Sequence, residues 1–358
     1  MKRALQEYEV DDAVKLIILK GQGKAFCAGG DVVRFIKLIP QGHWSLAASF
    51  YRKQLLLDYL IAIYKKPLVV VMNGVVMGGG AGLSMNATFR VVTENTVFAM
   101  PEASIGHFPD VGASYFLSRL PGHFGEYLGL TGARISGSEM LKCGLATHFV
   151  FSKDIKSLED ELSKTTYVDA STIRTTLENF IHKPNLEQDS AWTRLDIINK
   201  CFSKKSIEDI LTSLETEVVR CRYNWMVTAI SSMKHASPTS LKICLKSIRE
   251  GRTSTLEECL RRDYIISRHM VRRIFNHDFF EGARAMFFDK DRKPQWEPSR
   301  LENVGEEFVK QFFTDEQRKG GGWRVWVVEP FSDGLCNVGL ESGPEQRSGL
   351  SVFSGLGP

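Results

Sequence analysis

The chain has 358 residues, of which 43% are hydrophobic and 25% are charged, and its formal net charge at pH 7 is +4. These are ordinary globular proportions, so they exclude collagen-like, coiled-coil and wholly disordered proteins. At roughly 100 to 200 residues per domain, the length predicts one large unit or two modest ones. The charge is too small to indicate a nucleic-acid-binding protein, although a local basic patch for a phosphorylated ligand stays open.

Cysteine usage and hydropathy restrict the cellular compartments in which the protein could work. The seven cysteines are scattered without a CxxC pair, which is typical of reduced thiols inside a cell and not of a disulfide framework or a zinc site. No apolar run reaches the roughly 18 residues that a membrane span needs, so we expect no membrane contact. The first residues contain no apolar secretory segment, and the final Leu-Gly-Pro is not a peroxisomal address of the Ser-Lys-Leu type.

The first hundred residues alternate short apolar runs with loops and helical spacing. Strands are predicted at Val14–Leu19, Leu68–Met72, Phe89–Val92 and Val97–Met100. Residues 32–63 have helical spacing that is broken near 40–42, which predicts two helices, and Leu83–Asn86 is expected to open another helix. Strands that alternate with helices favour an α/β architecture in which the loops at strand ends carry function.

The rest of the chain changes character twice. From about residue 155 to 313 the apolar residues recur every three or four positions, which predicts a helical region. The tail, 314–358, becomes rich in Gly and Ser without a sustained period, and we expect it to be largely disordered. Within this tail, residues 323–328 could pair locally as a strand.

Two glycine-rich loops each follow a predicted buried strand: Ala28-Gly29-Gly30-Asp31 and Gly78-Gly79-Gly80. Glycines let a backbone approach a ligand closely, and two converging N–H groups would form an oxyanion hole, with each donor contributing on the order of 3 kcal/mol. Neither loop has a phosphate-binding pattern. From local sequence alone, both loops could equally be tight turns in a crowded sheet.

Two carboxylates, Glu102 and Asp110, lie in a segment built mostly of apolar residues, Gly and Pro. Burial there would raise the pKa of each carboxyl toward the range that is useful for a general acid or base. The alternative for each is a helix cap or a loop salt bridge. His107 lies between them without a second ligand or nucleophile, so we expect a structural role for it. Five arginines between positions 261 and 273 predict a solvated face or, alternatively, a contact for ligand phosphates.

In this order, the stretches AFCAGGD, NGVVMGGGAGLS and FAMPEASIGHFPDVGASYFLSRLPG resemble the crotonase (enoyl-CoA hydratase/isomerase) superfamily, and within it the 3-hydroxyisobutyryl-CoA hydrolases of the peroxisomal plant branch. The resemblance covers roughly residues 10–313. It implies one domain over 1–313, with a spiral β/α core at 10–150 and a C-terminal helical region at 151–313. It also implies hydrolysis of the 3-hydroxyisobutyryl-CoA thioester in valine catabolism, with CoA as part of the substrate, no cofactor and no metal.

The resemblance also assigns roles to individual residues. The thioester oxygen would lie between the backbone N–H groups of Gly30 and Gly79, while Glu102 matches the catalytic Glu of the family. Asp110 matches the second acidic residue of the hydrolases. A substrate-lining Glu of relatives corresponds to Gln54, which can hydrogen-bond a hydroxyl group but carries no charge. The expected substrate contacts are therefore Gln54, Gly79, Glu102 and Asp110.

One position bears on the choice of reaction. Hydratases of the superfamily carry a further catalytic Glu at the place of Gly82, and without it the syn addition of water loses half of its acid/base pair. Hydrolysis is therefore favoured over a hydratase or isomerase reaction. A third hypothesis is an inactive acyl-CoA-binding homologue, because the family's usual opening strand and helix are absent and the chain resembles an N-terminally truncated form.

Location and assembly follow only from the resemblance. The plant branch implies peroxisomes, with mitochondria or the cytosol as alternatives because the sequence shows no targeting signal. An acyl-CoA is the expected partner. Crotonases are often trimers or hexamers, so a homo-oligomer stays open.

Overall fold

The computed structural model describes residues 1–38, 44–165, 169–221, 223–315 and 350–354. Its strands are β1 (Leu16–Lys20), β2 (Ala25–Cys27), β3 (Leu68–Met72), β4 (Val75–Met77), β5 (Phe89–Val92), β6 (Val97–Ala99), β7 (Ile135–Ser136), β8 (His148–Phe149) and β9 (Leu350–Ser354). They form two sheets, in the orders β8-β5-β3-β1-β9 and β2-β4-β6-β7. The first sheet is entirely parallel, and in the second only β6 and β7 are antiparallel.

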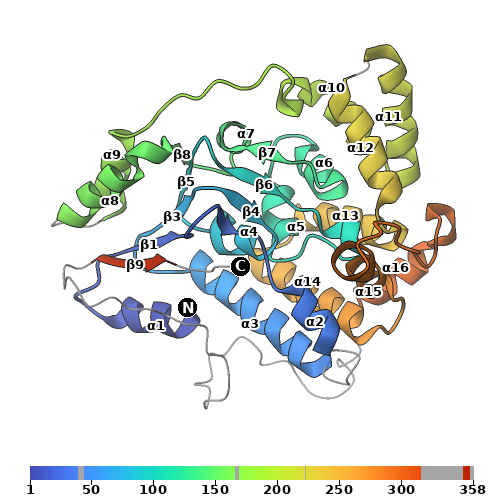
Figure 1. Ribbon diagram of the computed structural model, residues 1–358, viewed down its shortest axis with the longest axis horizontal. Helices are drawn as coiled ribbons and strands as arrows, with labels where there is room; N and C mark the ends of the chain where they lie inside the picture. Colours follow the sequence, from blue (N-terminus) through green and yellow to red (C-terminus); the bar gives the residue numbers. More distant parts are fainter. Residues whose placement is uncertain (39–43, 166–168, 222, 316–349, 355–358) are drawn as a thin grey trace.

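The helices surround these sheets (Figure 1). The α-helices are α1 (Lys2–Val10), α2 (Val32–Leu38), α3 (Trp44–Ala62), α4 (Gly79–Met85), α5 (Ala113–Leu117), α6 (Phe124–Thr131), α7 (Gly137–Cys143), α8 (Ile155–Lys164), α9 (Ala170–Glu178), α10 (Leu195–Phe202), α11 (Ile207–Cys221), α12 (Asn224–His235), α13 (Pro238–Gly251), α14 (Leu256–Arg272), α15 (Asp278–Ala283) and α16 (Glu306–Phe312). Short 3₁₀ turns are η2 (Glu102–Ile105), η3 (Ser152–Asp154), η4 (Ala191–Arg194) and η6 (Leu301–Asn303), and η5 (Arg284–Phe288) is a π-helical turn.

Each turn of the core adds one strand to each sheet. The chain passes from β1 to β2, returns through α2 and α3 to β3 and β4, and returns again through α4 to β5 and β6. A parallel sheet is covered on both faces, so its strands are apolar on both sides, and every residue of β3 is buried. The prediction of a spiral α/β core followed by a helical region is confirmed.

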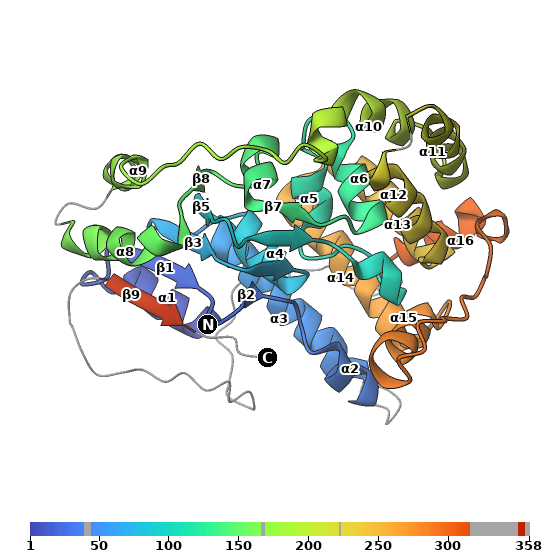
Figure 2. The same cartoon turned by 45° about the horizontal axis from the view of Figure 1, so that its top comes forward.

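The two faces of the first sheet pack against different helices. Ile17 and Leu19 of β1 point into the main core, whereas Leu16 and Ile18 join a second cluster that includes Leu158 of α8 and residues of α9. This alternation is the period of two that a strand imposes on its side chains. Figures 1 and 2 show α8 and α9 beside β8 and β5, while α10, α11 and α12 lie at the opposite end of the molecule.

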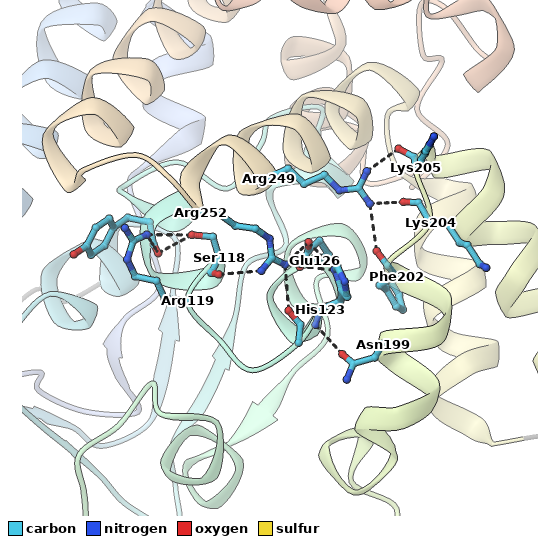
Figure 3. Close-up of polar contacts among 12 residues, drawn as sticks. Ser118, Arg119, His123, Glu126, Asn199, Phe202, Lys204, Lys205, Arg249 and Arg252 are labelled. Carbon is cyan, nitrogen blue, oxygen red and sulfur yellow. Dashed lines mark hydrogen bonds and ion pairs between the residues drawn. The ribbon is translucent and has the colours of Figure 1, made fainter.

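Two arginines at the C-terminal end of α13, Arg249 in its last turn and Arg252 as its C-cap, fasten the helical region to the core (Figure 3). Arg249 donates to the backbone carbonyls of Phe202, Lys204 and Lys205 at the end of α10. Three residues further on, Arg252 donates to Oε1 of the buried Glu126 in α6 at 2.7 Å. Because both arginines lie at the C-terminal end of α13, this end of the helix fixes α10 relative to α6.

The structure bears on two expectations about the chain ends. We expected the family's usual opening strand and helix to be absent; the chain as described begins with a helix, Lys2–Val10, in which Leu5 is buried and its carbonyl accepts a hydrogen bond from the Tyr64 hydroxyl at 2.5 Å. We also expected a tail without order, but Leu350–Ser354 forms β9, which pairs in parallel with β1. A sheet edge supplies its own row of backbone partners, so a strand there needs no strong local pattern. The strand expected at 323–328 lies outside the described residues.

Helix α4 also begins earlier than expected, at Gly79 and not near Leu83. The sequence predicts these glycines to be loop residues, but in the structure they lie in the helix and allow it to pack closely. A Cβ at Gly80 would lie 2.2 Å from the carbonyl oxygen of Cys27, so only glycine lets the first turn of α4 lie against β2.

Candidate active site

A cavity of about 460 Å³ lies where the loops after β2, β4 and β6 meet α3 and the π-helical turn η5. Its lining contains all five residues that the sequence analysis assigned to the site: Gly30, Gln54, Gly79, Glu102 and Asp110. They come from separate turns of the spiral and are brought together by the parallel arrangement of the strands, whose carboxyl ends lie at one edge of each sheet.

The two glycine-rich loops meet at the cavity wall. A Cβ built on Gly79 would lie 3.7 Å from Cα of Gly29 and 3.9 Å from the amide nitrogen of Gly30. Gly29 and Gly78 have φ values of 106° and 50°, a left-handed backbone that favours glycine. Gly79 is the first residue of α4, so its N–H has no acceptor within the helix. The arrangement places two backbone amides, Gly30 and Gly79, side by side at the cavity.

Glu102 opens the 3₁₀ turn η2 and is 8% exposed. Its Oε1 lies 3.2 Å from the point where a Cβ on Gly78 would be, so the carboxyl is next to the second glycine loop. Its Oε2 is buried without a hydrogen-bond partner among the described residues. Burial, and after it the charge of Asp110, raises the pKa of Glu102 well above its ordinary value. A raised pKa increases the proton affinity of the carboxyl, which favours its use as a general base.

Asp110 begins a strained turn before α5. Burial raises its pKa to about 7. The next residue, Val111, has a φ of 54°, which is costly for a β-branched side chain and is found where the surrounding structure imposes it. The constraint comes from Gly112, whose amide donates to Oδ2 of Asp263 at 2.8 Å, and from the Ala113 amide, which donates to the Asp110 carbonyl at 2.8 Å.

His107 lines the cavity but packs as an aromatic residue. Its ring is stacked on Tyr51 at a centroid distance of 5.6 Å and on Phe108 at 5.0 Å, and its Nδ1 lies 2.9 Å from the Phe108 carbonyl oxygen. Burial lowers its pKa to about 4, so the imidazole is neutral at pH 7. These contacts agree with the structural role that we expected.

Two carboxyls near the site were missed by the sequence analysis, Asp58 of α3 and Asp263 of α14. Both are fully buried, and burial raises the pKa of each, that of Asp263 to about 8. Asp58 accepts a 2.8 Å hydrogen bond from Nε2 of Gln54. A signal was present for Asp58, because it lies four residues after Gln54 in a helix, where side chains share a face. Asp263 is far from the motifs in sequence and gave no signal.

The arginines at 261–273 are not part of the cavity lining. Arg268 is 4% exposed and pairs with Asp315 at 3.2 Å, and Arg262 pairs with Glu250 at 3.4 Å. Arg272 stacks on the ring of Trp44, with 4.8 Å between its guanidinium carbon and the ring centroid. These arginines take part in packing and ion pairs, so the cluster is not a wholly solvated face.

The described part of the chain contains no group of three His, Cys, Asp or Glu side chains placed to hold a metal ion. Among the described helices, none combines the length and apolar character that crossing a membrane requires.

Comparison with known proteins agrees with this geometry. The signature of the enoyl-CoA hydratase/isomerase family matches residues 1–313. The chain is 53% identical over 306 residues to the probable 3-hydroxyisobutyryl-CoA hydrolase 3 of Arabidopsis thaliana, covering 86% of this chain and 81% of that protein. It is 39% identical over 313 residues to the mitochondrial 3-hydroxyisobutyryl-CoA hydrolase of Homo sapiens, covering 86% of this chain and 79% of that protein.

Among solved structures, a carnitinyl-CoA dehydratase from Mycobacterium thermoresistibile superposes with a TM-score of 0.79 at 32% identity, over 88% of this chain and 87% of that one. The chain therefore belongs to the enoyl-CoA hydratase/isomerase, or crotonase, family.

Proposed function

We propose that the protein hydrolyses the thioester of 3-hydroxyisobutyryl-CoA to 3-hydroxyisobutyrate and CoA. The observation that carries the proposal is the pairing of buried Glu102 with two adjacent backbone amides, Gly30 and Gly79, in one cavity. A carboxylate that can act as base or nucleophile, together with two donors for the carbonyl oxygen, is what attack on an acyl carbonyl requires. The names of the Arabidopsis and human relatives supply the substrate.

The reaction uses each group in turn. The N–H groups of Gly30 and Gly79 donate to the thioester oxygen, which becomes negatively charged when a nucleophile adds to the carbonyl carbon. Collapse of the tetrahedral intermediate breaks the C–S bond, and the electron pair leaves with the CoA sulfur. A thiolate is a good leaving group, so this step needs no metal. The proton taken from the attacking water ends on the CoA thiol.

Glu102 has two ways to bring in water. As a general base it removes a proton from water that attacks the thioester directly. As a nucleophile its ionised oxygen attacks first, and water then cleaves the mixed anhydride. Both ways require the ionised carboxyl at the moment of attack, and in both the dry surroundings of Glu102 leave its charge poorly solvated and therefore reactive.

The substrate's 3-hydroxyl group is held by two polar side chains that line the same cavity, Asp110 and Gln54. A site built to hydrogen-bond a hydroxyl group rejects the analogue that lacks it, because buried polar groups would then be unpaired. Asp110 can also orient the attacking water.

The glycine at position 82 is evidence against hydration of an enoyl-CoA. The position that carries the second acid/base Glu of hydratases lies in α4, and a Cβ there would be 2.7 Å from Oδ2 of Asp58. A longer side chain does not fit beside Asp58. This packing supports hydrolysis over the hydratase alternative.

The test is CoA-thiol release by the purified chain from 3-hydroxyisobutyryl-CoA, with crotonyl-CoA hydration measured beside it. We expect release without hydration, and a loss of about 10²- to 10⁴-fold in kcat for Glu102→Gln. Hydration of crotonyl-CoA at a rate similar to thioester cleavage would contradict the proposal. Binding of acyl-CoA by a folded chain with no release, unchanged by Glu102→Gln, would instead support an inactive homologue.

A peroxisomal location is part of the proposal, on the resemblance to the plant branch alone. The human relative is named as mitochondrial, so the two compartments are the ones to compare. Imaging of the chain with a fluorescent tag at either end, against markers of both organelles, tests this assignment.

A further inference from the structure

Helix α3 carries three polar side chains toward the site on one face. Tyr51 and Gln54 line the cavity, whereas Asp58 does not reach it and is fully buried behind Gln54. The spacings of three and four residues place the three side chains one above another along the helix. Asp58 is therefore placed to act on the cavity only through Gln54.

The contact between the two side chains is specific. Nε2 of Gln54 donates to Oδ1 of Asp58 at 2.8 Å, while Oδ2 of Asp58 has no hydrogen-bond partner among the described residues. A carboxamide is planar, with its oxygen and nitrogen on opposite sides of one carbon. When the nitrogen is held by Asp58 on the buried side, the oxygen Oε1 is left for the cavity. Without Asp58, a Gln at this position could present either its oxygen or its NH₂ group.

The fold makes room for this carboxyl. A Cβ on Gly82 would lie 2.7 Å from Oδ2, 2.8 Å from Cγ and 2.8 Å from Oδ1 of Asp58. Distances below 3.0 Å are closer than real Cβ contacts, so any larger residue at position 82 displaces the Asp58 side chain. Gly82 of α4 and Asp58 of α3 are thus matched: the helix that borders the second glycine loop leaves space for the group that holds Gln54.

We propose that Asp58 is a positioning residue that fixes the Gln54 amide with Oε1 toward the cavity, where it accepts a hydrogen bond from the 3-hydroxyl group of the substrate. This inference rests on the proposed function, since it names how the same site selects a hydroxyacyl chain. A hydroxyl group donates well to a fixed carbonyl oxygen, whereas an acyl chain without that group leaves the oxygen unpaired.

The test measures two substrates with each member of a double-mutant cycle. CoA-thiol release is measured from 3-hydroxyisobutyryl-CoA and from isobutyryl-CoA, which has the same carbon skeleton without the hydroxyl group. The variants are Asp58→Leu, Gln54→Leu, the double variant, and Asp58→Asn as the conservative control, because Asn keeps an acceptor oxygen. Thermal unfolding of each variant confirms that it is folded. Gly82→Ala is a second way to displace Asp58 if the leucine variant does not fold.

We expect Asp58→Leu to lower kcat/KM for the hydroxylated substrate about tenfold, the equivalent of one hydrogen bond, and for isobutyryl-CoA less than about twofold. Asp58→Asn should recover most of the loss, and Asp58→Leu should add nothing in the Gln54→Leu background. Equal losses on both substrates, or additive effects of the two leucine variants, would overturn the inference and leave Asp58 a packing residue. The wild-type arm reports separately on the proposed function: no release from either substrate refutes that function, and with it the inference.

Discussion

The amide of Gly112 donates a 2.8 Å hydrogen bond to Oδ2 of Asp263, a residue 151 positions further along the chain. This bond ties the turn that carries Asp110 to helix α14. Val111, which lies between Asp110 and Gly112, has a left-handed backbone. The hydrogen bond therefore holds the turn in a conformation that it would not adopt alone. The position of Asp110 in the cavity thus depends on a residue outside the sequence motifs.

Removal of this acceptor should cost both stability and activity. Asp263→Leu leaves the buried Gly112 amide unpaired, for which we expect a loss of about 1 to 3 kcal/mol in the free energy of unfolding. With the turn released, kcat should fall as well. Asp263→Asn is the matched control, because it retains an oxygen that can accept from Gly112. Denaturant unfolding and CoA-thiol release check both effects, and equal behaviour of the Leu and Asn variants would contradict the role of the bond.

The same residue should give stability a characteristic pH dependence. Burial raises the pKa of Asp263 from its ordinary 3.8 to about 8, so between these values the folded chain binds a proton that the unfolded chain has lost. Its contribution to stability is complete below pH 3.8 and decreases as pH rises toward 8. Asp263→Asn cannot ionise, so its unfolding free energy should fall less across this range. A parallel decline in both proteins would refute the assignment.

The rate of hydrolysis should rise with pH as Glu102 ionises. Glu102 must be ionised to act, and its pKa is raised by burial and then by the charge of Asp110. The acid limb of the kcat/KM profile should therefore lie well above the usual range of a glutamate. Asp110→Asn removes the neighbouring charge, so it should move this limb to lower pH while it lowers the maximum rate. A limb that stays in place would show that Asp110 does not influence Glu102. The measurement is CoA release at pH 4.5 to 9.

The oxyanion role of Gly79 can be tested although the donor is a backbone group. Gly79 is the first residue of α4, a position that tolerates proline, so Gly79→Pro removes the N–H while it leaves the helix intact. We expect kcat to fall by about 10²- to 10³-fold, the usual cost of one lost donor. Gly79→Ala keeps the N–H, and its Cβ meets nothing closer than 3.7 Å, so it should lose much less activity. Similar losses in the two variants would indicate a steric effect.

The attachment of the helical region depends on one buried charge. Glu126 is fully buried, and its Oε1 accepts from Arg252 at 2.7 Å and contacts Nδ1 of His123 at 3.0 Å. Arg252→Leu removes the arginine partner of this buried carboxylate and leaves only His123 beside it, which should lower the unfolding free energy by about 3 kcal/mol. Arg249→Leu is the comparison, because it frees only backbone carbonyls near the surface, and should cost about 1 kcal/mol. Denaturant unfolding of both variants measures the difference, and equal costs would contradict a special role for the buried pair.

Much of the core could be predicted from local pattern. The apolar run Leu68–Met72 is β3 with the predicted bounds, because five consecutive apolar residues of high β-propensity fit a strand covered on both faces. The helical region also follows from periodicity, since burying one face of a helix requires apolar residues every three or four positions. The elements at the two ends of the described chain are harder to predict from local pattern. Helix α1 buries one side chain, and β9 is defined by its pairing with β1.

The sequence by itself determined which residues could do chemistry at the site, because glycine loops and the carboxylates Glu102 and Asp110 stand out in an apolar setting. Only the tertiary structure decided how those groups are supported. Asp58 and Asp263 look like ordinary polar positions of two helices, and they lie behind the site because α3 and α14 pack against each other beside it. Burial then raises the pKa of each. Desolvation and long-range contacts depend on what surrounds a residue in space, and local sequence does not specify these surroundings.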